Sequence, residues 1–455
     1  MPAPALTLSP SETTMSLRKI LLVAGTGSAI DWYDFFIYGT AAALVFNKLF
    51  FPADDPLVGT LLAFTTFAVG FAARPIGGVI FGHVGDKLGR KPALVTTLFL
   101  MGISTTLIGL LPSYATIGVA APIILVALRL LQGIAVGGQW AGGALIATEN
   151  APPEKRGLYG SFAQIGVAAG LFLSTGVFLL VGALISEQAF LSWGWRVPFL
   201  LSVVLVGIAF YAQLALDETA PMKNVQRRGE QSRSPVLDVV IHHWRTVALG
   251  AGSIVVIGTS FYLFGTYFLS YGTTVLGLPR SLLLNGVLVG AALQFVAIPL
   301  CGALSDRIGR RTVYLVGAVA LGLWVWPAFL LLESGSAVAV IAAIAVGEVL
   351  VALVYGPQAA LFAELFTARL RYSGASLGYQ IGTLVGGALT PLIATALYAR
   401  WGSFVPVAGW VVLTAVASFV SVVVMSETAR TQLDDEAPSP DADESRTSDL
   451  RPEPA

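Results

Sequence analysis

The residues of this chain that could do chemistry are a few ionisable side chains inside long apolar segments. Asp31 and Asp34 lie in the first such segment, Arg129 in the fourth and Glu348 in the tenth. A charged side chain in a lipid-spanning helix costs about 3 kcal/mol or more, so such residues normally face a cavity, find partners and carry function. These four side chains are therefore the first candidates for binding a proton or a charged ligand.

Asp34 and Arg129 are expected at a similar depth. Their segments run in opposite directions, and a rise of about 1.5 Å per residue puts Asp34 just past the middle of its segment and Arg129 about ten residues into its own. We hypothesise that Arg129 pairs with Asp34 when no proton is bound, and that protonation of Asp34 frees the guanidinium for an anionic group of a substrate. Asp31 could take the same role, and a static ion pair that fixes helix packing is the competing interpretation.

Glu348 follows Arg129 by about 219 residues, roughly half of the chain, and occupies the related place in the second half. A second proton site or a contact with a substrate amine is the expectation there. Other polar side chains could supply hydrogen bonds or an aromatic wall, although packing between helices is the competing role for each alone. They are Tyr38, Gln132, Gln139, Tyr262, Tyr267, Tyr379 and Gln380. Arg74 is expected to be a snorkelling anchor.

The elements that must position these residues are membrane-spanning helices. The 455 residues are 56% hydrophobic and 11% charged, and the mean hydropathy is +0.79. Apolar stretches recur that are about 20 residues long, the length needed to cross a bilayer as a helix. The predicted spans are residues 17–48, 57–82, 93–111, 118–148, 157–185, 190–216, 244–276, 281–304, 312–332, 337–365, 372–399 and 404–426. The predicted fold is therefore all-α, with twelve transmembrane helices.

The distribution of basic residues predicts the orientation in the membrane. Of the 26 Lys and Arg, about twenty fall on the side of the N-terminus, where the positive-inside rule places the cytoplasm. The other side holds only Lys48, Arg196, Arg280 and Arg400. Both termini are expected in the cytoplasm.

Five segments are expected from this topology. They are a cytoplasmic N-terminal tail (1–16), an N-terminal six-helix bundle (17–216), a cytoplasmic linker (217–243), a C-terminal six-helix bundle (244–426) and a disordered cytoplasmic tail (427–455). The linker is polar. The C-terminal tail is acidic and rich in proline, a composition typical of disorder.

A repeated motif supports two related halves. Residues 82–91, GHVGDKLGRK, return as residues 302–311, GALSDRIGRR, each copy after the second span of its half. An offset of half the chain predicts two pseudo-symmetric six-helix units. The motif glycines permit a tight turn and close helix approach.

The charged residues of the motif are expected to form a cytoplasmic latch. Asp86 and Asp306 can cap a helix N-terminus or pair with Arg90 and Arg310, in a contact that holds one conformation and releases in the other. Two glutamates, Glu149 and Glu364, end the fourth and tenth spans and are expected to partner the two arginines. Positive-inside anchoring alone does not explain two matching aspartates.

These segments resemble a known family. The duplicated loop is similar to the signature loop of the major facilitator superfamily. The segments GTGSAIDWYDFFIYG, RPIGGVIFGHVGDKLGRK, LRLLQGIAVGGQWAGGALIATENAP, LSWGWRVPFL and RYSGASLGYQIG resemble its metabolite:proton symporter family, whose members carry shikimate, proline and betaine, or 2-oxoglutarate. Two positions depart from the family pattern, since Asp31 and Gln139 stand where it usually has Glu.

The resemblance implies a secondary active transporter with the major facilitator fold in the cell inner membrane. Proton-coupled uptake of a small organic acid such as a shikimate-like carboxylate, by alternating access, is the expected function. The alternatives are symport of a zwitterionic osmolyte and proton-antiport export. An enzyme is not expected, because no HExxH motif, nucleotide loop or Ser/His/Asp cluster is present. The expected partners are a small substrate, protons and the lipid bilayer, with no nucleic acid, metal or cofactor, and a monomer is expected.

Overall fold

The computed structural model describes residues 25–88, 90–137, 144–145, 147–149, 151–214, 241, 243–366 and 371–428. All regular structure in these ranges is helical. Eight of the described helices are long and apolar enough to cross a membrane, and two shorter apolar helices accompany them, Thr96–Leu110 and Ala120–Val136. Of the predicted segments, the N-terminal tail, nearly all of the linker and the tail after residue 428 lie outside the described residues.

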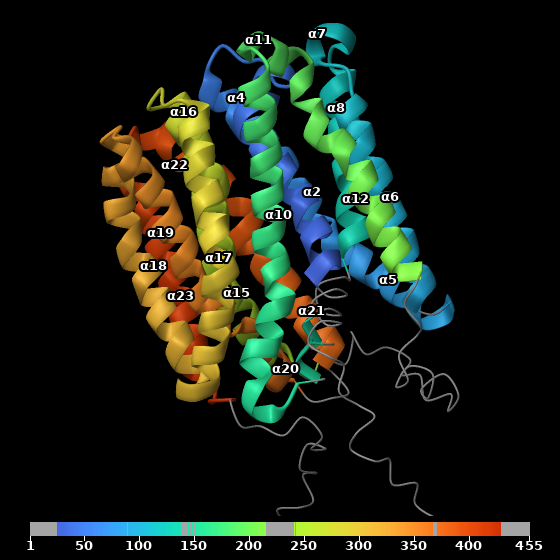
Figure 1. Ribbon diagram of the computed structural model, residues 1–455, viewed down its shortest axis with the longest axis vertical. Helices are drawn as coiled ribbons and strands as arrows, with labels where there is room; N and C mark the ends of the chain where they lie inside the picture. The colour runs from blue at the N-terminus through green and yellow to red at the C-terminus, as the bar shows by residue number, and fades with distance from the viewer. Residues whose placement is uncertain are drawn as a thin grey trace, which may run out of the picture.

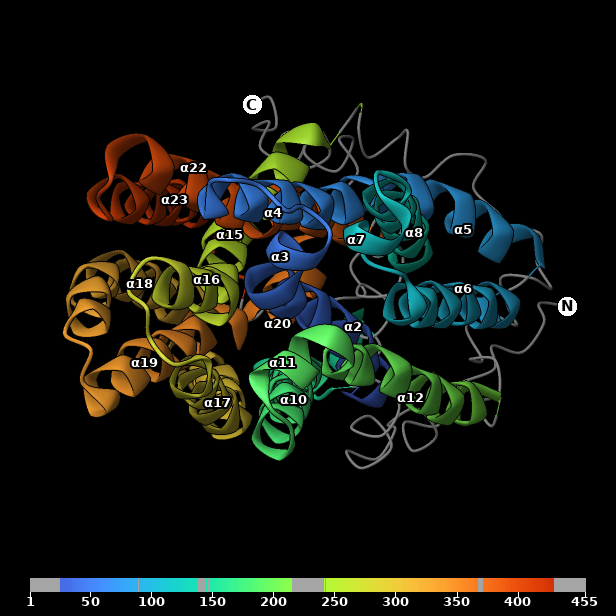
Figure 2. The same cartoon turned by 90° about the horizontal axis from the view of Figure 1, so that it is seen from above.

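The first half of the chain forms one group of helices (Figures 1 and 2). Its long elements are α2 (Thr26–Ala41), which continues as the π-helix η2 (Ala42–Phe46), α4 (Pro56–Ala72), α5 (Arg74–Leu88), α6 (Arg90–Leu110), α8 (Ala120–Val136), α10 (Arg156–Leu184) and α12 (Arg196–Leu214). Short elements join them, namely α3 (Asn47–Leu49), α7 (Tyr114–Ile117), η3 (Pro153–Lys155), α11 (Glu187–Ala189) and η4 (Phe190–Gly194).

The second half forms the other group. It consists of α15 (Trp244–Tyr262), which continues through the π-helix η5 (Leu263–Tyr267) into α16 (Phe268–Thr274), then α17 (Arg280–Ile308), α18 (Arg310–Glu333), α19 (Ala337–Tyr355), α20 (Gln358–Leu365), α21 (Arg371–Gly382), the π-helix η6 (Thr383–Ala388), α22 (Leu389–Trp401) and α23 (Val405–Val424). The predicted span 337–365 is broken in the structure, where Pro357 separates α19 from α20.

The two groups meet along α10 and α17, which lie side by side in both views. A motif glycine makes this approach possible: a Cβ on Gly302 would lie 2.6 Å from the carbonyl oxygen of Gly157 and 2.7 Å from the Cβ of Ser161. The second motif glycine, Gly309, has φ +97° between α17 and α18, a conformation that other residues rarely adopt. Both roles were predicted from the motif.

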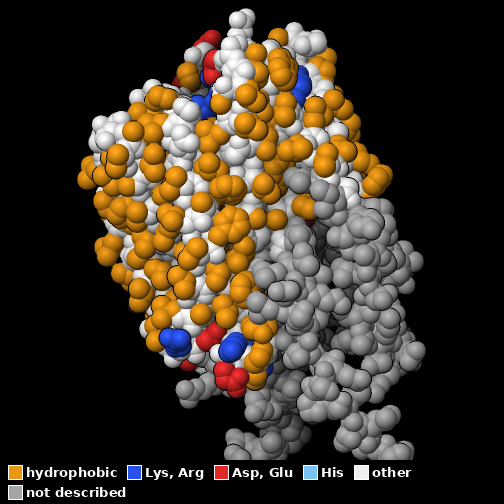
Figure 3. Space-filling view, in the orientation of Figure 1, with side chains coloured by type: hydrophobic (Ala, Val, Ile, Leu, Met, Phe, Trp, Pro, Cys, Tyr) orange, Lys and Arg blue, Asp and Glu red, His pale blue; other side chains and the backbone are white. Residues whose placement is uncertain are grey.

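The outer surface is apolar, as a lipid-facing surface must be. Large hydrophobic side chains such as Leu184, Leu323 and Val424 are more than half exposed. In Figure 3 hydrophobic side chains cover the middle of the described face, and charged side chains gather toward the two ends. We call the end that holds the α17–α18 turn the motif end, and the end where α4 begins and α16 terminates the opposite end.

Two of the π-helices, η2 and η5, sit at matching places in the two halves. Residues 42–46 interrupt the first helix of the chain, and residues 263–267 interrupt the first helix of the second half. Their separation is close to the offset between the two motif copies. Single π-helical turns inside α-helices occur often at functional sites, so this match directs attention to the centre of the bundle, between α2 and α15.

Candidate functional site

Asp34 lies on α2 with no solvent exposure, and both of its carboxylate oxygens accept a hydrogen bond. The hydroxyl of Thr105, on α6, donates to Oδ2 at 2.9 Å. The hydroxyl of Ser202, on α12, donates to Oδ1 at 2.9 Å. Both partners were missed in the sequence, because Ser and Thr in apolar helices usually bond to their own backbone and carry no distinguishing pattern.

Arg129, on α8, is buried without an acid in contact. Its Nη1 donates to the side-chain oxygen of Gln132 one turn later, and its guanidinium carbon lies 3.8 Å from the ring centre of Tyr38. The Nε and Nη2 atoms are buried with no hydrogen-bond partner in the described residues. These two atoms form one edge of the guanidinium, the geometry that binds both oxygens of a carboxylate.

A chain of hydrogen bonds connects the two charged residues. Arg129 donates to Gln132, Gln132 donates to Thr105 at 2.8 Å, and Thr105 donates to Asp34 at 2.9 Å. The direct Asp34–Arg129 ion pair that we predicted is absent from the ion pairs among the described residues. Asp34 points toward α6 and α12, whereas the guanidinium lies against Tyr38, so the two groups communicate through two intervening side chains.

Helix packing fixes the position of the Arg129 side chain. A Cβ on Gly70 of α4 would lie 2.8 Å from the Arg129 Nε and 3.1 Å from its Cγ. A Cβ on Gly133, one turn after Arg129, would lie 3.0 Å from the Cβ of Ala73. Small residues at a helix crossing let two backbones approach closely. The stem of Arg129 therefore fills the space that the missing side chain of Gly70 leaves.

An aromatic wall from both halves lies beside this pair. Tyr262 of α15 packs edge to face against Phe67 at 5.1 Å and against Phe71 at 5.7 Å between ring centres. Phe67 also lies 5.4 Å from the Arg129 guanidinium carbon. The hydroxyl of Tyr262 is buried and has no hydrogen-bond partner among the described residues. The structure thus brings the predicted residues Tyr38, Gln132 and Tyr262 to the Asp34–Arg129 cluster.

Other predicted residues lie elsewhere. Asp31 is half-buried and is not a member of the described hydrogen-bond chain. Tyr379 is buried on α21, and the neighbouring Gln380 donates to the carbonyl of Gly137 at 3.0 Å, a contact between the halves. Gln139 lies outside the described residues.

Glu348 is not part of the Asp34–Arg129 cluster. It is buried on α19, and Gln294 of α17 donates to its Oε2 at 2.8 Å. Its Oε1 has no partner in the described part of the chain and faces Gly265 of the π-helix η5. The structure therefore gives the second half a buried acid of its own, held by an amide instead of by a cation.

The second motif copy forms a charged cluster at the motif end. Arg310 donates to Asp306 at 2.6 Å and to Glu364 at 3.3 Å, as the motif predicted. The carboxylate of Asp306 also accepts from the backbone N–H groups of Gly157 and Leu158, at 2.8 and 2.9 Å, in the first turn of α10. An anion at a helix N-terminus is favoured by the unpaired N–H groups there. Asp306 thus links the two halves.

Glu149 makes a second contact at this end. It pairs with Arg371 of the other half at 3.2 Å, and its pairing with Arg90 stays a prediction. Only the helical backbone is described for Asp86 and Arg90, so the first motif copy lies outside the described side chains. Glu149 follows the fourth predicted span, whereas Arg371 begins α21 in the other half, so this pair joins the two halves.

The beginning of the C-terminal segment is ordered against the same cluster. Glu427 accepts from the backbone N–H groups of Arg310 and Arg311, at 3.1 and 3.2 Å. The hydroxyl of Thr428 donates to Glu364 at 2.9 Å. The predicted disordered tail began at residue 427, and these contacts place its first two residues on the folded body. Glu427 therefore caps the N-terminus of α18. This role was not predicted, because Glu427 is far from the motif in sequence.

Similarity to known proteins decides the family. The family model described as sugar (and other) transporter matches residues 20–234, and that of the major facilitator superfamily matches residues 286–452. The chain is 42% identical to the shikimate transporter of Escherichia coli over 92% of this chain and 98% of the relative. The chain belongs to the metabolite:proton symporter family of the major facilitator superfamily.

Two further relatives agree with this family and with its fold. The inner membrane metabolite transport protein YhjE of Escherichia coli is 43% identical over 85% of this chain and 89% of its own length. A structure of the proton:xylose symporter XylE superimposes with a TM-score of 0.70 at 17% identity and covers 92% of this chain and 97% of that one. The protein is thus a multi-pass secondary transporter with the twelve-helix major facilitator fold, and it is not an enzyme, as predicted.

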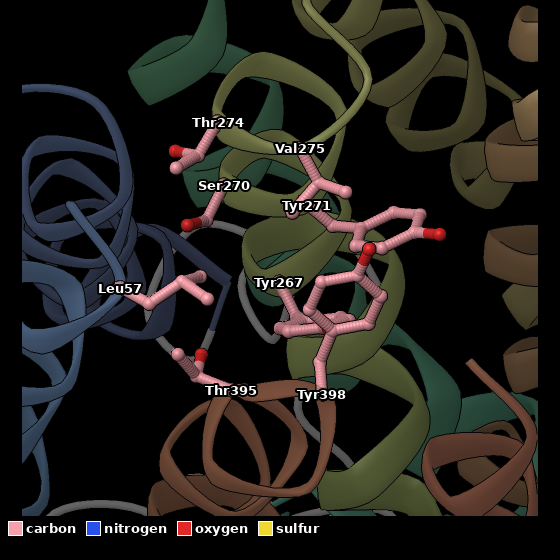
Figure 4. Close-up of a pocket in the computed structure, with 8 residues that line it drawn as sticks. All are labelled: Leu57, Tyr267, Ser270, Tyr271, Thr274, Val275, Thr395 and Tyr398. Carbon is pink, nitrogen blue, oxygen red and sulfur yellow. The ribbon is translucent and has the colours of Figure 1, made fainter. Parts of the chain in front are cut away.

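The transporter is also closed at the opposite end. Arg280 at the start of α17 pairs with Glu187 of α11 at 3.1 Å, across the two halves. A small pocket near this end contains Leu57 of α4, which faces Tyr267, Tyr271 and Tyr398 of the second half (Figure 4). Tyr267 stacks on Tyr271 at 5.8 Å and its hydroxyl has no partner in the described residues. Contacts between the two halves are therefore described at both ends of the bundle.

Proposed function

We propose that this transporter takes up a small organic acid together with a proton, by alternating access, with Asp34 as the proton site and Arg129 as the anion site. One observation carries the proposal: a fully buried guanidinium has an unpartnered carboxylate-binding edge and is linked by hydrogen bonds to a buried carboxylate. The names of the relatives agree with it, since one carries shikimate and a structural neighbour is a proton symporter.

When Asp34 is deprotonated, each hydrogen bond between Arg129 and Asp34 donates in the direction of the Asp34 carboxylate. The direction runs from Arg129 through Gln132 and Thr105 to Asp34. Aligned hydrogen bonds polarise one another, and in a medium of low dielectric they connect the two opposite charges without direct contact. The positive charge of Arg129 is then partly compensated from within the protein, and its affinity for an external anion is reduced.

Protonation reverses the last link, because a threonine hydroxyl has only one proton. The Oγ1 of Thr105 lies within hydrogen-bond distance of three groups: Asp34 Oδ2 at 2.9 Å, Gln132 Nε2 at 2.8 Å and the carbonyl of Met101 at 3.0 Å. When Asp34 carries a proton, the acid donates to Thr105, and Thr105 turns its own proton to Met101. All of these groups keep a hydrogen-bond partner, but the series of hydrogen bonds that starts at Arg129 no longer ends at an anion. Arg129 then favours the carboxylate of a substrate, so proton and anion bind together.

Alternating access requires a latch that opens. From the distribution of Lys and Arg in the sequence, we propose that the motif end faces the cytoplasm. The contacts of Asp306 with α10 and of Glu149 with Arg371 then break when the cargo is released on that side. The contact between Arg280 and Glu187 serves the outer end in the same way. In this proposal, contacts at both ends belong to an occluded step between the two open states, and such contacts are present at the motif end and at the opposite end.

Transport into proteoliposomes tests the proposal. A panel of labelled organic acids and zwitterions is measured with an inside-alkaline pH gradient and without one. Uphill accumulation of at least one acid only with the gradient is the expected result. Accumulation of zwitterions alone supports the osmolyte alternative, and gradient-driven efflux supports an antiporter. If no compound responds to the gradient, the coupling proposal is wrong.

A further inference from the structure

Two buried ionisable side chains, Arg74 and Glu348, have no role in the mechanism above. The sequence predicted a snorkelling anchor for Arg74, and this prediction is wrong, because the residue is only 3% exposed. Its guanidinium carbon lies 3.9 Å from the ring centre of Phe35 and 3.8 Å from that of Phe71. Arg74 therefore belongs to the aromatic centre of the bundle, whereas Glu348 occupies a site of its own in the second half.

Glu348 lies in a slot between two glycines. A Cβ on Gly290 of α17 would lie 2.8 Å from the Cβ of Glu348 and 2.9 Å from its Cγ. A Cβ on Gly265 of η5 would lie 3.3 Å from the Oε1 of Glu348 and 3.8 Å from the Cδ1 of Leu171, which belongs to α10 of the first half. The carboxyl group is therefore buried next to the first half, and the slot leaves little space beside it.

The same arrangement holds Arg129 in the first half. The stem of Arg129 lies where Gly70 has no side chain, and the stem of Glu348 lies where Gly290 has none. The two glycines, and likewise the two ionisable residues, are separated by nearly the offset of the two motif copies. Ligand sites in transporters built from repeats lie where the repeats meet. Corresponding positions of the two halves thus hold a cation and an acid.

The hydrogen bonds of Glu348 lack one donor. Gln294 uses both N–H groups of its amide on this residue, since Nε2 donates to Oε2 and to the backbone carbonyl of Glu348, each at 2.8 Å. The Oε1 of Glu348 and the Oε1 of Gln294 are both buried with no partner in the described part of the chain. Both are acceptors. A proton on the carboxyl group supplies the missing donor, because an acid O–H donates to an amide oxygen while the amide N–H donates to the acid.

Asp34 has different surroundings in the same structure. Two hydroxyls donate to its two oxygens, which suits an ionised carboxylate. Glu348 receives only the amide of Gln294, and it belongs to none of the ion pairs in the described ranges. An ionised carboxylate that is buried without a cation costs several kcal/mol. The slot therefore fits the protonated form of Glu348.

The helices around Glu348 place their charges away from it. Each Lys, Arg, Asp and Glu on α10, α15, α17, α18 and α20 lies in the first or last turn of its helix, whereas Glu348 lies in the middle of α19. The other titratable side chains on these elements, on α19 and on η5 include four phenols and a thiol, which stay neutral below about pH 8. They are Tyr262, Tyr267, Tyr314, Tyr355 and Cys301. The helix α2, which packs against η5, adds Asp31 and Asp34.

We propose that Glu348 is a second proton-binding site and that the two halves close only when it carries its proton. In an open state the two halves separate beside Leu171, water reaches the carboxyl group, and the proton passes to that water. Closure returns the carboxyl group to a slot without a cation, so the ionised form opposes closure.

This role goes beyond the proposed function. The loaded and the empty transporter both have to close, so Glu348 carries its proton in both directions and adds no proton to the net coupling. Asp34 couples the cargo to the gradient, and Glu348 sets the pH range in which the halves close. A metal ion or a substrate ammonium group fits the slot less well than a proton does, because Gly265 already lies close to the Oε1 of Glu348.

Spin-label distances in lipid bilayers test the proposal without any cargo. Labels are placed on exposed positions of the two halves, such as Gln188 and Ser334 at the opposite end, with Cys301 replaced by serine. The background is Asp34→Asn, so that the charge of Asp34 does not vary. Between about pH 5 and about pH 8, the ratio of closed to open protein is expected to fall as the pH rises, because the closed state holds the proton more firmly. The fall approaches about tenfold per pH unit, the limit for one linked proton.

Adding Glu348→Gln is expected to remove this pH dependence and keep the protein closed, because the new amide supplies an N–H in place of the acid O–H. If this variant does not fold, Glu348→Met, which is uncharged at every pH, replaces it with the same expectation. Glu154→Gln removes an exposed acid at η3 and is the control that leaves the fall intact.

Three results overturn the inference. One is a closed-to-open ratio in Asp34→Asn that does not change with pH. Another is a fall that persists when Glu348 is replaced, which assigns the proton to another acid such as Asp31. The third is a ratio that Na⁺ restores at high pH, which makes the slot a metal-ion site. Failure here is separable from failure of the proposed function, because these distances need no cargo and gradient-driven uptake through Asp34 needs no titration of Glu348.

Discussion

Replacing Thr105 with valine isolates the hydrogen-bond chain. Valine keeps the branched shape of the side chain but has no hydroxyl, so the links to Asp34 and from Gln132 are both lost. The neighbour Thr106 provides a matched control, because the one bond that its hydroxyl makes within the described residues goes to the carbonyl of Gly102 on its own helix, at 2.7 Å. Thr105→Val thus removes a hydroxyl that contacts Asp34, and Thr106→Val removes one on the same helix that does not.

The size of the effect follows from the two protonation states. A hydrogen bond to a charged group is worth about 1.5–3 kcal/mol and one between neutral groups about 0.5–1.5 kcal/mol. Loss of the hydroxyl therefore penalises the ionised carboxylate by about 1.4 kcal/mol more than the protonated acid. The protonated form then persists to higher pH, and the midpoint of the pH dependence moves upward by about one pH unit.

The assay is the initial rate of gradient-driven uptake as a function of external pH in proteoliposomes. Thr105→Val is expected to move the midpoint upward by about one unit, Thr105→Ser to restore it to within a few tenths of a unit, and Thr106→Val to leave it unchanged. Equal shifts in Thr105→Val and Thr106→Val, or a wild-type midpoint in Thr105→Val, refute the assignment of Thr105 as the link between Asp34 and Gln132.

Three further predictions concern the motif end. Gly302→Ala forces a Cβ against Gly157 and Ser161, so we expect the closed state of this end to be destabilised by about 1–3 kcal/mol. Distances between spin labels placed across this end should then lengthen. Gly409→Ala is the control and should leave these distances unchanged, because a Cβ there has no atom within 4 Å. Glu149→Arg places two cations together and is expected to lower the transport rate by up to about fivefold, because the pair is partly exposed. Adding Arg371→Glu restores opposite charges and should recover the transport rate. A double variant that does not recover argues against the latch. Glu427→Gln removes the charge that caps α18 and is expected to destabilise closure by about 0.5–1 kcal/mol; unchanged distances in that variant contradict a role of the C-terminal segment in the latch.

The general architecture was accessible from the sequence because its signals are local or periodic. Spans follow from apolar length, and the motif glycines follow from their conformational needs, as Gly302 and Gly309 illustrate. The pair between Arg310 and Asp306 was predicted because its members lie four residues apart in the repeated motif. Positions of this kind depend on the chain nearby and not on the way distant helices meet.

The details of the site were not accessible in the same way. Thr105 and Ser202 reach Asp34 from helices that are distant in sequence, and a hydroxyl in an apolar helix gives no signal of its own. Equal depth in the membrane suggested a direct contact between Asp34 and Arg129, but depth says nothing about the direction in which side chains point around a helix axis. Arg74 was misplaced for the same reason, since a position near a span end permits both a snorkelling and a buried side chain.

The central claim is that a proton on Asp34 is bound and released in each transport cycle and controls the anion site at Arg129. Asp34→Asn, which imitates the permanently protonated acid, tests it most directly in proteoliposomes loaded with unlabelled cargo, beside Asp31→Asn as the control. The account predicts that Asp34→Asn still exchanges labelled for unlabelled cargo but no longer accumulates it when a pH gradient is imposed, whereas Asp31→Asn does both. Gradient-driven accumulation at the wild-type level in Asp34→Asn contradicts it.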